Sequence, residues 1–140
     1  MTSRPTTRLT IFVLIALLLG CANGSLPAAT PRFSDEAALT VVLAARGYPG
    51  AVVKGSEIRG VEAAARLPGV TIHIAGARRD GARLIADGGR VLAVTATGNS
   101  VTQAQSRAYA AVDAIDWPEG FCRRDIGWRA VARERDMELR

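Results

Sequence analysis

The chain has 140 residues, 49% hydrophobic and 22% charged, with a net charge of +5 at pH 7. This length fits one domain and excludes two large ones, and so apolar a composition excludes a disordered chain. The basic balance favours anionic partners, and a pocket for phosphorylated metabolites fits it as well as a nucleic-acid groove does. The arginines are spread along the chain without an aromatic ladder between them, so no nucleic-acid partner is expected.

The N-terminus allows two interpretations. Arg4 and Arg8 precede an apolar run from Leu9 to Leu19, followed by Gly20 and Cys21, which is typical of a secretory signal and resembles a lipoprotein cleavage box with Cys21 as the acylated residue. The run is too short to span a bilayer. The alternative is an ordinary buried helix, since apolar residues recur at the spacing of one helical face, at Ile11, Leu14, Ile15, Leu18 and Leu19.

The next segment predicts a connection, a strand and a turn. Two prolines over residues 25–33 indicate an irregular connection, and the β-branched run from Leu39 to Leu43 predicts a buried strand. The turn that follows is Arg46-Gly-Tyr-Pro-Gly50. Its proline restricts the backbone, while its glycines let the chain reverse or approach a ligand closely.

The middle of the chain reads as a short helix and three strands. Residues 60–67 predict the helix, ended by Pro68-Gly69, and Val70 to Ala75 predict a strand. Alternation along that strand places His73 on the face opposite its valine and isoleucines, pointing away from the apolar layer. Two further strand-like runs flank Asp87-Gly88-Gly89, a composition that favours positive φ and predicts a β-hairpin.

The C-terminal third predicts an amphipathic helix. Ser100 and Gln103 have the spacing of a capping box, so the helix should begin there and end before Trp117-Pro118. Its apolar face comprises Val101, Ala104, Ala108, Ala111, Val112 and Ile115. A charged, solvated tail is expected over residues 133–140.

The sequence contains few residues that could form a catalytic or metal-binding site. Cys21 and Cys122 form no C-x-x-C pair, and His73 is the only imidazole, so neither a zinc site nor a multi-histidine metal site is indicated. No phosphate loop or dinucleotide fingerprint occurs; Lys54 precedes a glycine rather than following one, and a solvated lysine is expected. The residues alone therefore do not make a complete active site.

One tripeptide, Arg-Arg-Asp, occurs twice in surroundings that resemble loops. The copies are Arg78-Arg79-Asp80 and Arg123-Arg124-Asp125. A guanidinium presents a planar fork of donors suited to phosphate or carboxylate, and a neighbouring aspartate can orient it. The competing interpretation of each copy is a surface charge cluster.

Five ordered blocks of the sequence carry a family resemblance. They are DEAALTVVLAARGYPG, KGSEIRG, GVTIHIAGARRDG, IADGGRVLAVTATG and AQSRAYAAVDAIDWPEGFCRRDIGWRAV. From about Asn23 to Ala132 the chain resembles the C-terminal domain of phosphoribosylamine-glycine ligase, a purine-biosynthesis enzyme. The resemblance implies an α+β fold, a small β-rich barrel-sandwich-like domain of the rudiment single hybrid type with a packed amphipathic helix.

The resemblance also implies a function divided between domains. The family joins phosphoribosylamine to glycine with ATP and magnesium, through glycyl phosphate, on an ATP-grasp portion that lies N-terminal to the matched region. This chain is then expected to be a C-terminal domain fragment, cytoplasmic and inactive alone, that completes the substrate site with the N-terminal and ATP-grasp domains as partners. The alternative is an exported lipoprotein, anchored through Cys21, whose small β domain binds an anion.

The resemblance assigns substrate-binding roles to two loops and sets expected boundaries. The loop residues are Gly47, Tyr48, Pro49, Gly50, Arg123, Arg124 and Asp125. An apolar helix or signal-like segment is expected over residues 1–22, the ligase domain over 23–132 and the charged tail beyond. Where the family reads Phe-His-Ala-Gly-Thr this chain has His73-Ile-Ala-Gly-Ala77, which moves the histidine to the other strand face. Residues before about Ala16 match poorly, as in a truncated or rearranged reading frame.

Overall fold

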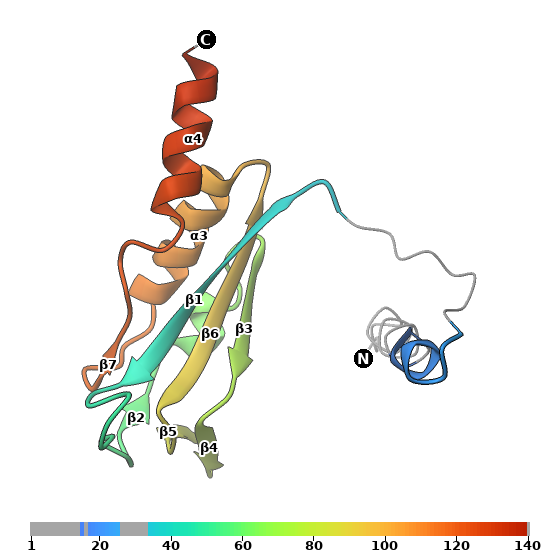
Figure 1. Cartoon of the computed structure of the whole chain (residues 1–140). Helices are drawn as coiled ribbons and strands as arrows, with labels where there is room; N and C mark the ends of the chain where they lie inside the picture. Colours follow the sequence, from blue (N-terminus) through green and yellow to red (C-terminus); the bar gives the residue numbers. More distant parts are fainter. Residues whose placement is uncertain (1–14, 16, 26–33, 140) are drawn as a thin grey trace, which may run out of the picture. The chain divides into compact units, whose positions relative to one another are not determined.

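A computed structural model describes residues 15, 17–25 and 34–139 (Figure 1). The chain divides into a short unit that ends at Ser34 and a larger unit that begins at Asp35. In the first unit residues 17–22 are helical. Most of the apolar run from Leu9, and residues 26–33 of the predicted connection, lie outside the described residues.

The larger unit contains a four-stranded antiparallel sheet with the order β3-β6-β1-β7. Its strands are β3 (Val70–Ile74), β6 (Arg90–Gly98), β1 (Ala37–Ala45) and β7 (Gly120–Phe121). Alternation places Leu39, Val41 and Leu43 of β1 on one face, opposite Ala96, Val94 and Leu92 of β6, and all six are buried. The strand predicted over Leu39 to Leu43 is confirmed, and His73 of β3 is exposed as predicted.

A second sheet has the order β2-β5-β4 and corrects one prediction. Its strands are β2 (Glu57–Ile58), β5 (Arg83–Ala86) and β4 (Ala77–Asp80). The predicted hairpin around Asp87-Gly88-Gly89 was wrong, because β5 and β6 belong to different sheets and that tripeptide joins them. The hairpin is formed instead by β4 and β5, whose residues Asp80 and Arg83 pair across a two-residue turn with Gly81 at φ 60°.

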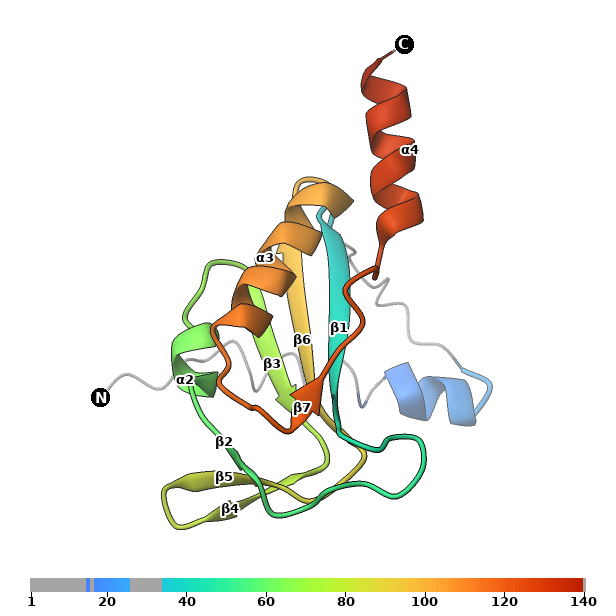
Figure 2. The same cartoon turned by 90° about the vertical axis from the view of Figure 1, so that its left-hand side faces the viewer.

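Helix α3 (Val101–Asp113) covers one face of the larger sheet (Figure 2). The predicted cap is present, since the Gln103 amide donates to the Ser100 hydroxyl at 3.1 Å, and the Gln103 side chain accepts from the Asn99 amide at 2.9 Å. Small residues on the helix face, Ala104, Ala108 and Ala111, are fully buried and bring α3 close to β1 and β6. The short helix predicted over residues 60–67 is present as α2 (Val61–Ala64).

Helix α4 (Trp128–Glu138) includes most of the segment predicted to be a solvated tail. The segment is largely exposed but helical, and it extends beyond the sheet in Figure 1. Its carboxylate at Glu134 accepts hydrogen bonds from the amides of Val101 (2.6 Å) and Thr102 (2.9 Å) and from the Thr102 hydroxyl (2.7 Å). These amides open helix α3 and have no partner within that helix, so Glu134 caps α3 from a second helix.

This cap makes the docking of α4 sensitive to acid. Hydrogen bonds from Thr102 and Val101 lower the pKa of Glu134 below its ordinary value. A carboxyl group whose pKa is lower in the folded state stabilises it above the unfolded pKa, and that stabilisation is lost as the pH falls through the folded value. We expect protection of the α4 amides against hydrogen exchange to be complete at neutral pH and to fall as the pH drops below about 5.

Two variants check the assignment of this pH dependence. Glu134→Gln should already show weak α4 protection at neutral pH and little further change in acid. Glu62→Gln, which removes an exposed carboxylate from α2, should behave as the unaltered chain does. Equal protection of α4 in the unaltered chain and in Glu134→Gln would contradict the role of the cap.

The α+β class and the packed amphipathic helix are therefore confirmed. The two sheets are open and do not close into a barrel. The core of the larger unit lies between α3 and the larger sheet and continues to β5 and Trp117, whose indole donates to the Ser56 hydroxyl at 2.8 Å.

Candidate functional site

The Gly47 to Gly50 turn follows the end of β1. Gly47 has φ 93°, and a Cβ there would overlap the carbonyl oxygen of Ala51, so the turn requires glycine. The ring of Tyr48 lies against Gly89, where a Cβ would stand 2.6 Å from the Tyr48 Cδ2 atom. The turn thus fixes a half-exposed phenol at the end of the larger sheet.

The Arg123 to Asp125 segment forms the loop between β7 and α4. The Arg123 guanidinium donates twice to the Asp125 carboxylate, through Nε at 2.9 Å and Nη2 at 2.6 Å. This pairing raises the pKa of Arg123 and lowers that of Asp125. The aspartate therefore orients the guanidinium two residues before it, as the sequence suggested, and also occupies part of its donor set.

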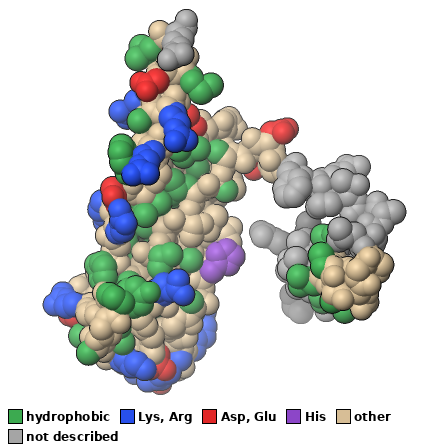
Figure 3. All heavy atoms as spheres, viewed as in Figure 1, with side chains coloured by type: hydrophobic (Ala, Val, Ile, Leu, Met, Phe, Trp, Pro, Cys, Tyr) green, Lys and Arg blue, Asp and Glu red, His purple; other side chains and the backbone are tan. Residues whose placement is uncertain are grey.

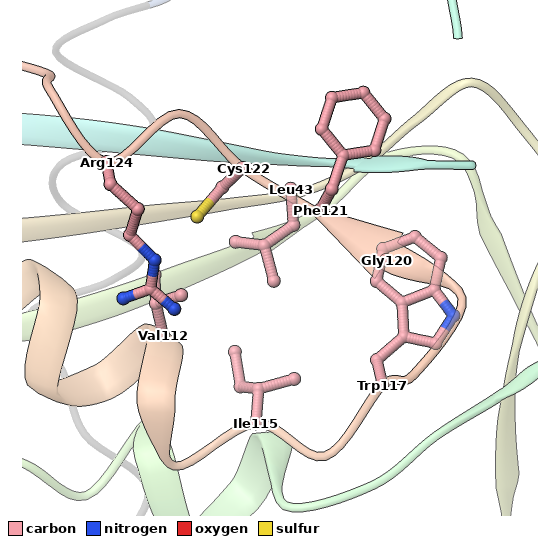
Figure 4. Close-up of a pocket in the computed structure, with 8 residues that line it drawn as sticks. All are labelled: Leu43, Val112, Ile115, Trp117, Gly120, Phe121, Cys122 and Arg124. Carbon is pink, nitrogen blue, oxygen red and sulfur yellow. The ribbon is translucent and has the colours of Figure 1, made fainter. Parts of the chain in front are cut away.

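Arg124 points in another direction. Its Nη1 donates to Asp113 at 2.6 Å, and its guanidinium lies 5.5 Å from the centre of the Tyr109 ring. Figure 4 shows it at the mouth of an inner hollow of about 280 Å³ between β1, β7 and the end of α3. Leu43, Ile115 and Trp117 wall this hollow. Cys122 also lines it, and burial raises the pKa of that thiol.

Tyr48 and Arg123 meet in a different hollow, of about 210 Å³. A second hollow, of about 260 Å³, shares Val42 and Arg90 with it. We call the two together the outer trough, because Val42 and Ala93 point away from the face that α3 covers. Its lining residues are Val42, Ala44, Tyr48, Ala75, Arg90, Leu92, Ala93, Phe121, Cys122 and Arg123. Figure 3 shows hydrophobic and basic side chains side by side at the lower end of the larger sheet.

The structure thus divides the predicted loop residues. It brings Tyr48 and Arg123 together from positions far apart in the sequence, whereas Arg124 lines the inner hollow. Gly47, Pro49, Gly50 and Asp125 do not line the outer trough. Arg90, which the sequence analysis did not single out, lies where the two outer hollows meet; only its position directly after Asp87-Gly88-Gly89 marked it.

Comparison with known proteins gives the family. The model described as "Phosphoribosylglycinamide synthetase, C domain" matches residues 38–129, which is more than half of the chain. The chain belongs to this family. A phosphoribosylamine-glycine ligase of Mesorhizobium japonicum is 62% identical over 122 residues, covering 87% of this chain and 28% of the relative. One from Escherichia coli O6:H1 is 42% identical over 123 residues, covering 88% of this chain and 29% of the relative.

A solved structure supports the same relationship. The C domain resembles the crystal structure of phosphoribosylamine-glycine ligase from Thermotoga maritima with a TM-score of 0.62 and 33% identity, covering 81% of this chain and 27% of that chain. The chain therefore spans between a quarter and a third of the length of these relatives. It corresponds to the C-terminal domain of a larger ligase of purine biosynthesis.

The remaining residues singled out from the sequence lie outside the outer trough. Arg78-Arg79-Asp80 was expected in a loop but forms β4, where Asp80 pairs with Arg83 at 2.8 Å. Lys54 is exposed and lies 3.7 Å from Asp87. We interpret both Arg78-Arg79-Asp80 and Lys54 as surface charges of the C domain.

Neither a metal centre nor a membrane-spanning helix is found in the part of the chain that the structure describes. Residues 15, 17–25 and 34–139 contain no group of three or more His, Cys, Asp and Glu placed to hold a metal ion. Within the same residues, no helix is long and apolar enough to cross a membrane.

Proposed function

We propose that this C domain completes the phosphoribosylamine side of a phosphoribosylamine-glycine ligase and leaves the ATP chemistry to other domains. The observation that carries the proposal is the meeting of Tyr48 and Arg123 in the outer trough. These two residues belong to the loops to which the family resemblance gives substrate-binding roles. Their convergence on one hollow is what a shared substrate wall requires.

The chemistry of the outer trough suits a sugar phosphate. Tyr48, Val42 and Phe121 present apolar and aromatic surface, which can hold the carbon face of a ribose ring, and Arg90 and Arg123 supply positive charge for an anion. Walls of this kind position the substrate amine and keep water away from a reactive acyl phosphate. The glycines of the Gly47 to Gly50 turn let the backbone come close to the substrate.

The described residues do not fit a magnesium-ATP site. They offer no acidic cluster for the metal and no glycine-rich phosphate loop, so no step through ATP is assigned to them. In the proposed enzyme the N-terminal and ATP-grasp domains, on the same or another polypeptide, carry those groups and form glycyl phosphate. The assembly is proposed to act in the cytoplasm.

The comparisons disfavour the lipoprotein alternative. A matched stretch of 122 residues leaves 18 of the 140 outside it, so wherever it begins it includes Cys21. The cysteine of the cleavage-box resemblance then falls within sequence shared with a ligase. Intact mass spectrometry tests this directly, because a lipid on Cys21 would contradict the proposal.

Complementation tests the proposed function. A ligase relative truncated before its C domain should gain ATP-dependent ligation of glycine to phosphoribosylamine when this chain is added or fused to its C-terminus. The chain alone should show none. Ligation by the purified chain alone, or no gain in the fusion, would contradict the division of labour. In the active fusion, Tyr48→Ala should raise the KM for phosphoribosylamine, whereas Leu67→Ala, in the exposed turn after α2 and outside the outer trough, should leave it unchanged.

A further inference from the structure

We infer that Arg90 is the residue that binds the phosphate of the ribose-phosphate substrate in the outer trough. The inference rests on the proposed function and goes beyond it, because it names the anchoring residue and the part of the substrate that it holds. Arg90 lies outside both loops to which the resemblance gives binding roles.

The position of Arg90 is rigid and central. It is the first residue of β6 and pairs with Ala44 of β1, and its carbonyl oxygen accepts a hydrogen bond from the Gly76 amide at 3.0 Å. Arg90 lines both outer hollows, which meet at this residue and at Val42. A side chain carried by a strand holds its ligand more precisely than one carried by a loop.

The guanidinium of Arg90 has no protein partner among the described residues. Other arginines near this end of the sheet are engaged: Arg46 pairs with Glu119 at 3.5 Å, and Arg123 binds Asp125 through two donors. No Asp or Glu lines either outer hollow. Arg90 is exposed and therefore offers an uncommitted fork of donors to an anion at the edge of a largely apolar trough.

The shape and lining of the trough favour a phosphoribosyl group over the carboxylate of glycine. Glycine has no carbon beyond its Cα with which to cover Val42 or the rings of Tyr48 and Phe121. A sugar phosphate can place its phosphate on Arg90 and its ring carbons on those walls. The planar guanidinium matches two phosphate oxygens at once.

Binding of ribose 5-phosphate to the full chain tests the inference. In a titration followed by amide NMR shifts, ribose 5-phosphate should shift the amides that line the outer trough, ribose should bind more weakly, and glycine should leave them unchanged. Arg90→Gln should weaken ribose 5-phosphate binding about tenfold or more. Arg78→Gln removes the same charge from exposed β4, outside the trough, and should leave binding unchanged.

Several outcomes would overturn the inference. These are no binding of ribose 5-phosphate to the unaltered chain, equal binding to Arg90→Gln, equal weakening in Arg78→Gln, or a response of the trough to glycine in place of ribose 5-phosphate. An Arg90→Gln variant with an altered amide spectrum would be replaced by Arg90→Lys, which keeps the charge but not the planar fork and should still weaken binding several-fold.

The fusion enzyme separates this inference from the proposed function. If the fusion ligates glycine but Arg90→Gln leaves the KM for phosphoribosylamine unchanged, the result contradicts phosphate binding by Arg90 and still supports the proposed function. If the fusion is inactive while Arg90→Gln still weakens ribose 5-phosphate binding, the result contradicts the proposed function and still supports an anion site at Arg90.

Discussion

Gly60→Ala is expected to lower the free energy of unfolding of the larger unit by about 3 kcal/mol. Gly60 has φ 78°, a conformation that costs an L-residue energy, and a Cβ there would overlap the carbonyl oxygen of Ala114. That oxygen cannot move away easily. Next to it, Arg59 and Asp116 exchange two backbone hydrogen bonds of 3.0 Å, which hold the two segments together.

A second glycine separates the two causes. Gly55 has φ 89°, but a Cβ there would meet nothing within 4 Å. Gly55→Ala should therefore lower stability by only the conformational cost, about 1 kcal/mol. Urea unfolding followed by circular dichroism measures both. Equal losses in the two variants would show that the contact with Ala114 contributes nothing.

Leu92→Ala is expected to cost about 3 kcal/mol. Leu92 is 1% exposed at the centre of the larger sheet, between Leu43 of β1 and Ile74 of β3. Truncation removes buried methyl groups and leaves a cavity that flanking strands cannot fill without breaking their ladders. Urea unfolding again provides the measurement.

The matched control is an exposed leucine. Leu67 is 36% exposed in the turn after α2, so Leu67→Ala should cost less than about 1 kcal/mol. Similar losses at the two positions would mean that the sheet centre does not form the main core of the unit.

Local patterns were sufficient for the elements that local interactions define. The cap at Ser100 needs only its own helix, the apolar run of β1 needs only a buried face, and β3 is marked by its β-branched residues, so all three could be predicted from the sequence. The strand with which a given strand pairs could not be predicted from the local sequence. Asp87-Gly88-Gly89 has hairpin composition, but β5 pairs with β2 and β4, and Leu84 and Ala86 of β5 are buried in the same core cluster as Ile58 of β2.

The helical conformation of the charged C-terminal segment was not predicted, for a related reason. Residues 133–139 have no strong apolar face that would predict a helix. The contact that stabilises this segment joins the Glu134 carboxylate to the amides at the start of α3. A contact between residues 33 positions apart leaves no local sequence signal.

The candidate site could be predicted only in part. The resemblance pointed to Tyr48 and Arg123, but their meeting in one hollow depends on how β7 pairs with the end of β1. Arg90 had no signal at all as an anion-binding residue. Several described arginines have no acidic partner, so Arg90 is distinguished only by its place in the lining of both outer hollows, which the sequence does not show.

The connections between the two sheets pass each other at Gly76 and Gly88. A Cβ on either residue would lie 2.9 Å from the Cα of the other, and the Asp87 amide donates to the Gly76 carbonyl at 2.8 Å beside them. At each position the added Cβ would approach the backbone of the other glycine. Keeping glycine at one position therefore does not make room for a side chain at the other. We therefore expect related domains that keep both sheets to have glycine at both positions. A related domain with glycine at only one of them should connect its sheets differently or lack the smaller sheet.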